Sequence, residues 1–154
     1  LKKLKITKNK NFIAQSYSLK SKQKISLVKI YPGVQQVLKE IKKSCKVAVV
    51  TSKDKRRTKI FLNKFNLTFD AVCCPQKGLK GKPNPDQILK ILKKFSIKKR
   101  DCVYVGDMFV DSLAAKNAKI DFIITNYGYS PQNFKKYNKH LKINKFEDLL
   151  KYKI

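Results

Sequence analysis

Two kinds of apolar pattern alternate along the chain from residue 31 onward. Short continuous apolar runs predict strands buried on both faces of a sheet, at residues 46–51, 69–74, 102–105 and 121–125. Segments with apolar residues three and four positions apart predict helices at residues 32–43, 54–65, 86–95, 109–118 and 146–152. Strands that alternate with helices of about ten residues are typical of βαβ units. We therefore expect an α/β domain built as a three-layer, doubly wound parallel sheet.

The polar residues that follow these strands should meet at one edge of the sheet. Right-handed crossovers bring the C-terminal ends of parallel strands to the same edge, where ligands of open α/β sheets bind. The residues expected there are Thr51, Ser52, the 74–85 loop, Asp107, Asp111 and Asn126.

Residues 1–30 are basic and only weakly patterned, and we expect helical pieces of a small accessory layer, with the α/β core at residues 31–154. The four cysteines fit neither a zinc-site spacing nor a CxxC redox pair, so we expect reduced thiols in the core.

The net charge of +27 is the largest deviation in the composition. Only three of the 37 basic residues are arginines, and the lysines are spread over every segment, which is typical of a general lysine bias and argues against a specific nucleic-acid site. A charge of this size still attracts polyanions at low salt. With 42% hydrophobic residues and no apolar run long enough to span a bilayer, we expect a globular cytoplasmic protein without a membrane partner.

Two carboxylates, Asp107 and Asp111, follow the strand at residues 102–105. If the chain is helical from residue 109, they lie about one turn apart and can converge at the mouth of the strand. Hard oxygen ligands at such a position suit Mg²⁺. The alternative is an acidic first helical turn that complements the helix dipole.

The other candidate groups are hydroxyls and one lysine. Thr51 and Ser52 stand before the helix at residues 54–65, where free N–H groups favour an anion. The alternative is that they act as N-caps, and the two roles can coexist. Lys82 lies between a glycine and two prolines that would orient it. At 4 Å from a phosphate charge its ammonium would gain about 4 kcal/mol at an effective dielectric constant near 20. A hydroxyl, an ammonium and a bound metal are the parts needed for phosphoryl transfer.

Three segments, in order, resemble motifs of the haloacid dehalogenase superfamily, in its phosphoglycolate phosphatase-like branch. Residues 49–53 (VVTSK) resemble its second motif, residues 81–86 (GKPNPD) its third, and residues 105–111 (VGDMFVD) its fourth. The resemblance runs from YPGV at residues 31–34 to NYGY at residues 126–129.

This resemblance implies a Rossmann-like core and a role for each matched residue. Thr51 would hydrogen-bond the transferred phosphoryl group, with Ser52 beside it, and Lys82 would steady the phosphate and the nucleophile. Asp107 would bind Mg²⁺ and Asp111 would support the metal site. Residues 1–30 would be the remnant of a helical cap.

The family's first motif, an apolar strand that ends in Asp-x-Asp and supplies the nucleophile, has no counterpart here, because the first acidic residue is Glu40. In the family that strand lies centrally, between the strands that end here at Thr51 and Val105. These two strands should therefore pair directly or leave a slot filled by N-terminal residues. The chain would be a fragment, which its first residue, Leu1, favours, or a degenerate homologue, or it would need a second chain.

The expected function is that of a Mg²⁺-dependent phosphatase acting on a small phosphorylated metabolite such as phosphoglycolate, with this chain inactive on its own. Two alternatives stay open from a different class, a non-catalytic pseudo-phosphatase and a basic nucleic-acid-binding module. A sugar-phosphate mutase is the alternative among enzymes, because the same scaffold supports phosphoryl transfer to a sugar.

Overall fold

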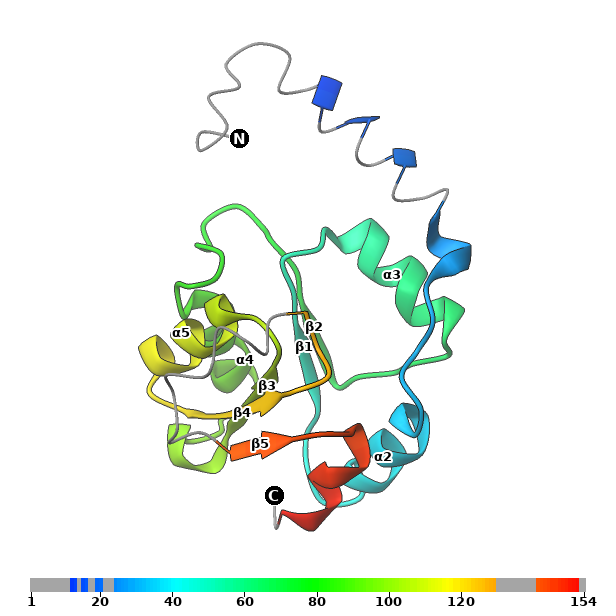
Figure 1. The fold of residues 1–154 in the computed structure, drawn as a ribbon. Helices are drawn as coiled ribbons and strands as arrows, with labels where there is room; N and C mark the ends of the chain where they lie inside the picture. The colour runs from blue at the N-terminus through cyan, green and yellow to red at the C-terminus, as the bar shows by residue number, and fades with distance from the viewer. Residues whose placement is uncertain (1–11, 14, 17–18, 21–23, 130–140, 153–154) are drawn as a thin grey trace. The chain divides into compact units, whose positions relative to one another are not determined.

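The computed structural model describes residues 12–13, 15–16, 19–20, 24–129 and 141–152 (Figure 1). The chain divides into two units, Leu1–Ile30 and Tyr31–Ile154. The described part of the first unit is helical at residues 12–13, 15–16 and 19–20 and contains a short 3₁₀ helix, η2 (Lys24–Leu27). Its interpretation as a cap remnant stays a prediction.

The second unit carries the alternating strands and helices that the sequence predicts. In chain order they are α2 (Val34–Ile41), β1 (Ala48–Val50), α3 (Lys55–Lys64), β2 (Ala71–Cys73), α4 (Asp86–Phe95), η3 (Lys99–Asp101), β3 (Val103–Gly106), α5 (Phe109–Ala118), β4 (Asp121–Thr125), β5 (Leu141–Ile143) and η5 (Phe146–Lys151). The α/β class is confirmed.

The sheet is divided into two parts. β1 pairs in parallel with β2, and β3, β4 and β5 form a second parallel group with β4 in the middle (Figure 1). Among the described strands, β1 and β3 do not pair with each other. Direct pairing, the first of the two predicted arrangements, is therefore wrong. The second arrangement, in which N-terminal residues fill the slot between β1 and β3, stays a prediction, because residues 1–11 lie outside the described part of the chain.

Strand β4 shows how helices cover both faces of the sheet. Ile123 packs with Val37 of α2 and Leu149 of η5, whereas its neighbour Ile124 packs with Ala115 of α5. Successive strand residues point to opposite faces, so these contacts place a helical layer on each side. The three-layer arrangement predicted from the sequence is confirmed.

Strand β5 was not predicted. It is three residues long, and its pattern of Leu141, Lys142 and Ile143 puts only Ile143 into the core. So short a segment, with a lysine at its centre, has little periodic signal. The C-terminal helix was predicted, but it is a 3₁₀ helix, η5.

All four cysteines are free thiols, as predicted, and Cys73 is buried. None of the helices in the described part of the chain is both long and apolar enough to cross a bilayer.

Replacing Ile123 by Ala should lower the free energy of unfolding by about 2–5 kcal/mol, because it opens a cavity at the centre of the core. Its partner across the β4–β5 register, Leu141, is 51% exposed. The matched variant Leu141→Ala should change stability by about 0.5 kcal/mol or less. Urea unfolding followed by circular dichroism compares the two. Equal losses would contradict the placement of β4 at the core.

Candidate functional site

A buried ion pair joins Lys82 to Asp111. The lysine Nζ lies 2.6 Å from Asp111 Oδ1, and the two side chains are only 11% and 5% exposed. Asp111 stands in the first turn of α5, where its Oδ2 accepts the backbone N–H of Met108 at 3.0 Å. Both carboxylate oxygens therefore have protein partners. The contact brings together two segments that are 29 residues apart in the sequence.

Tyr104 of β3 extends this cluster toward β1. Its hydroxyl lies 3.2 Å from Lys82 Nζ, 3.4 Å from Asp111 Oδ1 and 3.3 Å from the carbonyl oxygen of Val50, to which it donates. Burial and the neighbouring Asp111 carboxylate raise the pKa of Tyr104 far above its ordinary value, so the phenol stays protonated and can donate. The sequence analysis missed this residue, because a tyrosine in an apolar strand is indistinguishable from a core residue.

Asp107 is held by the loop that follows β4. Its Oδ2 accepts the backbone N–H of Tyr129 at 2.8 Å, and Oδ1 accepts no hydrogen bond from the described residues. Gly128 makes this approach possible, because a Cβ at that position would collide with the Asp107 side chain. One carboxylate oxygen is thus fixed by the backbone, and no residue in the described ranges hydrogen-bonds the other.

Thr51 follows β1 directly, but it does not cap α3. That cap is Asp54, which accepts the backbone N–H of Arg57 at 2.9 Å, so the alternative that made Thr51 and Ser52 the N-caps is wrong. The Thr51 hydroxyl instead accepts the backbone N–H of Lys53 at 3.0 Å, and Ser52 is exposed. Thr51 is adjacent in sequence to Val50, whose carbonyl contacts the Tyr104 hydroxyl.

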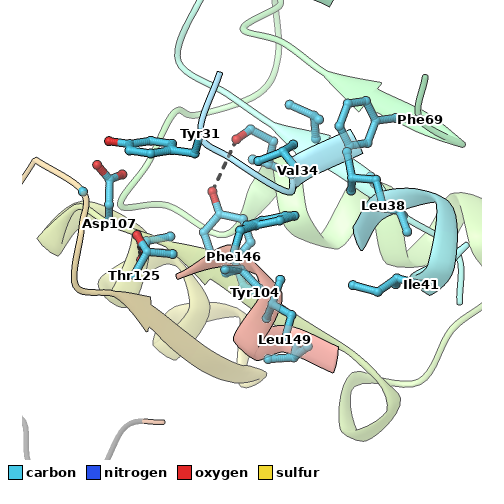
Figure 2. Close-up of a pocket in the computed structure, with 18 of the residues that line it drawn as sticks. Tyr31, Val34, Leu38, Ile41, Phe69, Tyr104, Asp107, Thr125, Phe146 and Leu149 are labelled. Atoms are coloured by element: carbon cyan, nitrogen blue, oxygen red, sulfur yellow. Dashed lines mark hydrogen bonds between the residues drawn. The ribbon is translucent and has the colours of Figure 1, made fainter. Parts of the chain in front are cut away.

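A cavity of about 590 Å³ lies between the two parts of the sheet. Figure 2 shows Asp107, Tyr31 and Thr125 grouped at one end, with apolar side chains such as Phe69 and Ile41 farther along. Of the five sequence-predicted site residues, Asp107 is the one that belongs to the cavity's described lining. The structure thus brings Lys82 and Asp111 together beside the end of β1 and places Asp107 at the cavity end.

The donor set at Asp107 fits a hard cation. Mg²⁺ is commonly held by one or two carboxylates together with water and phosphate oxygens, and Asp107 has, at the sheet edge, an oxygen that none of the described residues binds. In the described part of the chain, no three Asp, Glu, His or Cys side chains gather as a ready metal cage. Asp111 is engaged by Lys82. The assignment of Asp107 and Asp111 to a metal stays a prediction.

Comparison with known proteins identifies relatives of this chain. A family model described as haloacid dehalogenase-like hydrolase matches residues 1–125. Phosphoglycolate phosphatase 1 of Pseudomonas aeruginosa is 32% identical over 108 residues, which are 68% of this chain and 40% of that protein. Pyrophosphatase PpaX of Halalkalibacterium halodurans is 29% identical over 111 residues, which are 70% of this chain and 52% of that protein. The chain thus spans about half, or less than half, of the length of the curated relatives that it matches.

The fold also has solved counterparts. A haloacid dehalogenase-like family hydrolase from Streptococcus pneumoniae superposes with a TM-score of 0.77 at 16% identity, covering 97% of this chain and 73% of that one. This likeness concerns the fold alone.

Replacing Lys82 by Met should lower the free energy of unfolding by about 3–5 kcal/mol, because it leaves the buried Asp111 carboxylate without its counter-charge. The double variant Lys82→Met/Asp111→Asn should recover part of that loss, since it removes both charges. Lys80→Met, on the exposed part of the same loop, is the control and should be close to neutral. Chemical denaturation of the parent chain, Lys82→Met, Asp111→Asn, the double variant and Lys80→Met measures this coupling, and strictly additive losses would contradict it.

Replacing Gly128 by Ala should displace the loop from Asp107 and break the Tyr129–Asp107 hydrogen bond, because the new methyl group overlaps that side chain. We expect a loss of about 1–3 kcal/mol of stability. The matched control is Gly81→Ala, where a Cβ meets no atom within 4 Å. Thermal melts compare the two variants. An unchanged Gly128→Ala melt would show that the loop is not held against Asp107.

Proposed function

We propose that this chain forms the phosphate- and metal-binding part of a phosphatase, because it belongs to the haloacid dehalogenase-like hydrolase family. The cofactor would be Mg²⁺ and the substrate a small phosphorylated metabolite such as phosphoglycolate. The observation that supports this most is the buried Lys82–Asp111 pair, because it joins two of the three matched motifs, residues 81–86 and 105–111. The pair lies beside the end of β1, which belongs to the remaining matched motif, residues 49–53.

Each proposed role follows from the position of the group. Lys82, buried and oriented by Asp111 and Tyr104, would present its ammonium to a phosphate without much freedom to move away. Thr51 would donate its hydroxyl hydrogen to a phosphate oxygen. Asp107 would hold Mg²⁺ through Oδ1, and Asp111 would support the site by orienting Lys82. The metal, when bound, would neutralise charge on the phosphoryl oxygens.

The family's Asp-x-Asp nucleophile has no counterpart in these 154 residues. The first acidic residue is Glu40, in α2, and none precedes it where the family's Asp-x-Asp strand would stand. A phosphoryl group bound by Lys82 and Mg²⁺ would therefore lack the nucleophilic carboxylate that the family resemblance implies. We accordingly assign binding to these 154 residues and turnover to a longer assembly.

The relatives suggest two candidate substrates. One matched relative is named for phosphoglycolate and another for pyrophosphate, and both are small anions that carry a phosphate group. We place phosphoglycolate first, because several of the matched relatives carry its name. The evenly spread lysines give no reason to add a nucleic-acid partner.

Mg²⁺ together with phosphoglycolate should raise the melting temperature of the chain. At a ligand concentration of about 100 times Kd, binding contributes about 2.7 kcal/mol. Asp107→Asn should abolish the Mg²⁺-dependent part of the shift, whereas Asp101→Asn, at a 59% exposed carboxylate on η3, should keep it. Pyrophosphate is measured in parallel. If neither anion shifts the melting temperature in the presence of Mg²⁺, the proposed site is wrong.

The 154-residue chain should not hydrolyse p-nitrophenyl phosphate above the buffer rate, because it lacks a nucleophilic carboxylate. Release of p-nitrophenol is followed by absorbance with Mg²⁺ present. Turnover that Asp107→Ala abolishes would refute the assignment of this chain to binding alone.

A further inference from the structure

A glutamine side chain is buried where α4 meets the ends of two strands. Gln87, the second residue of α4, is 1% exposed. Its Nε2 donates to two carbonyl oxygens, that of Thr51 at 3.2 Å and that of Cys73 at 3.1 Å. Carbonyl groups cannot donate, so these contacts fix which end of the amide faces the strands. One side chain thus joins α4 to the ends of β1 and β2.

The Thr51 carbonyl needs this donor because the ladder between β1 and β2 ends there. Val50 pairs with Cys73, and the N–H of Thr51 donates to the Cys73 carbonyl at 3.1 Å. In a parallel ladder the next bond would run from the N–H of residue 75 to the carbonyl of Thr51. Residue 75 is a proline, which has no N–H. Gln87 supplies the donor in its place.

Thr51 is therefore held on both sides of its Cα. Its N–H is bound by Cys73 and its carbonyl by Gln87, so the planar peptide groups before and after it both have set directions. Those two directions determine where the side chain points. The hydroxyl accepts the N–H of Lys53 at 3.0 Å, and its single hydrogen is the group that can donate to a phosphate oxygen.

Gln87 also relates Thr51 to Lys82. The lysine stands five residues before Gln87, in the loop that leads into α4, and its ammonium lies 2.6 Å from Asp111. The start of α4 is therefore connected both to the buried lysine and to the end of β1. A displacement of α4 from β1 would change the spacing between the Thr51 hydroxyl and the Lys82 ammonium.

The amide of Gln87 is not fully satisfied by this arrangement. Its Oε1 is buried and accepts no hydrogen bond from the described residues. A buried acceptor without a partner lowers stability, so an apolar side chain of similar length, such as methionine, would fill the position without that penalty. What methionine could not reproduce is the pair of hydrogen bonds to the strand ends.

We propose that Gln87 is a positioning residue for phosphate binding, which holds the Thr51 hydroxyl at the spacing from Lys82 that one phosphate requires. The inference rests on the proposed function, because it takes Thr51 and Lys82 as the phosphate-binding groups. Gln87 lies outside the three matched segments, and it acts through the backbone of Thr51.

Titration calorimetry with phosphoglycolate and Mg²⁺ tests the coupling between the two residues. Thr51→Val removes the hydroxyl and should weaken binding to the parent chain by about tenfold. Gln87→Met should weaken binding by about fivefold or more, because the hydroxyl is no longer held in place. In the Gln87→Met background, Thr51→Val should weaken binding further by about twofold or less. A residue that only stabilises the fold would leave the contribution of Thr51 intact.

Two control variants separate positioning from stability. Asn117→Leu removes another bond from a side-chain amide to a carbonyl on the same loop, from Nδ2 to Pro83 at 2.9 Å. Ile88→Val shortens the side chain next to Gln87 in sequence, which is 3% exposed. Neither change removes a hydrogen bond to Thr51, so Thr51→Val should keep its effect of about tenfold in both backgrounds. Circular dichroism establishes that all variants are folded.

Amide hydrogen exchange measured by NMR tests the same contact without a ligand. The Lys53 N–H, which donates to the Thr51 hydroxyl, should exchange about tenfold faster in Gln87→Met than in the parent chain. The N–H of Arg57, at the cap of α3, should exchange at an unchanged rate. In the parent chain, which needs no substitution, the side-chain amide of Gln87 should exchange about tenfold more slowly than that of the exposed Gln36.

Each other outcome overturns one defined statement. Equal effects of Thr51→Val in the parent and Gln87→Met backgrounds would overturn the positioning role, and so would an unchanged exchange rate at Lys53. Rapid exchange of the Gln87 side-chain amide in the parent chain would overturn the contact itself. A parent chain that does not bind phosphoglycolate would refute the proposed function, while exchange at Lys53 would still decide whether Gln87 holds Thr51.

Discussion

The Lys82–Asp111 pair is the interaction on which the rest of the site depends. Both charges are nearly removed from water, so each is tolerable only because the other is there. The pair fixes the 74–85 loop against the start of α5, and Tyr104 connects it to the end of β1. Three segments distant in sequence are thereby held in one arrangement. A lysine that is one of many in this chain acquires a definite position from its carboxylate partner.

Much of the fold followed from the sequence, because the strands buried on both faces are continuous apolar runs and the helices between them are amphipathic. Residues 121–125 illustrate this, since β4 is apolar and lies at the centre of its group of strands. β5 lacked that signal, because only Ile143 of its three residues is buried. The division of the sheet also has no local signal, since it depends on which strand lies beside β1 and β3.

The candidate site was predictable as a set of residues, but not as a geometry. Motif spacing singled out Lys82 and Asp111, and the structure shows them in contact. Spacing could not show that Lys82 and the Met108 N–H each bind one carboxylate oxygen of Asp111, whereas Oδ1 of Asp107 accepts no hydrogen bond from the described residues. Nor could it reveal Tyr104, whose role comes from a hydroxyl at the end of an otherwise apolar side chain.

The hydrogen bond that holds Asp107 comes from the main chain of Tyr129, whose own side chain is 90% exposed. Nearly any amino acid at position 129 can supply that donor, and proline is the exception because it has no N–H. Most substitutions at position 129 should therefore leave the orientation of the Asp107 carboxylate unchanged. The neighbouring position 128 accepts little besides glycine, because any larger side chain would collide with Asp107.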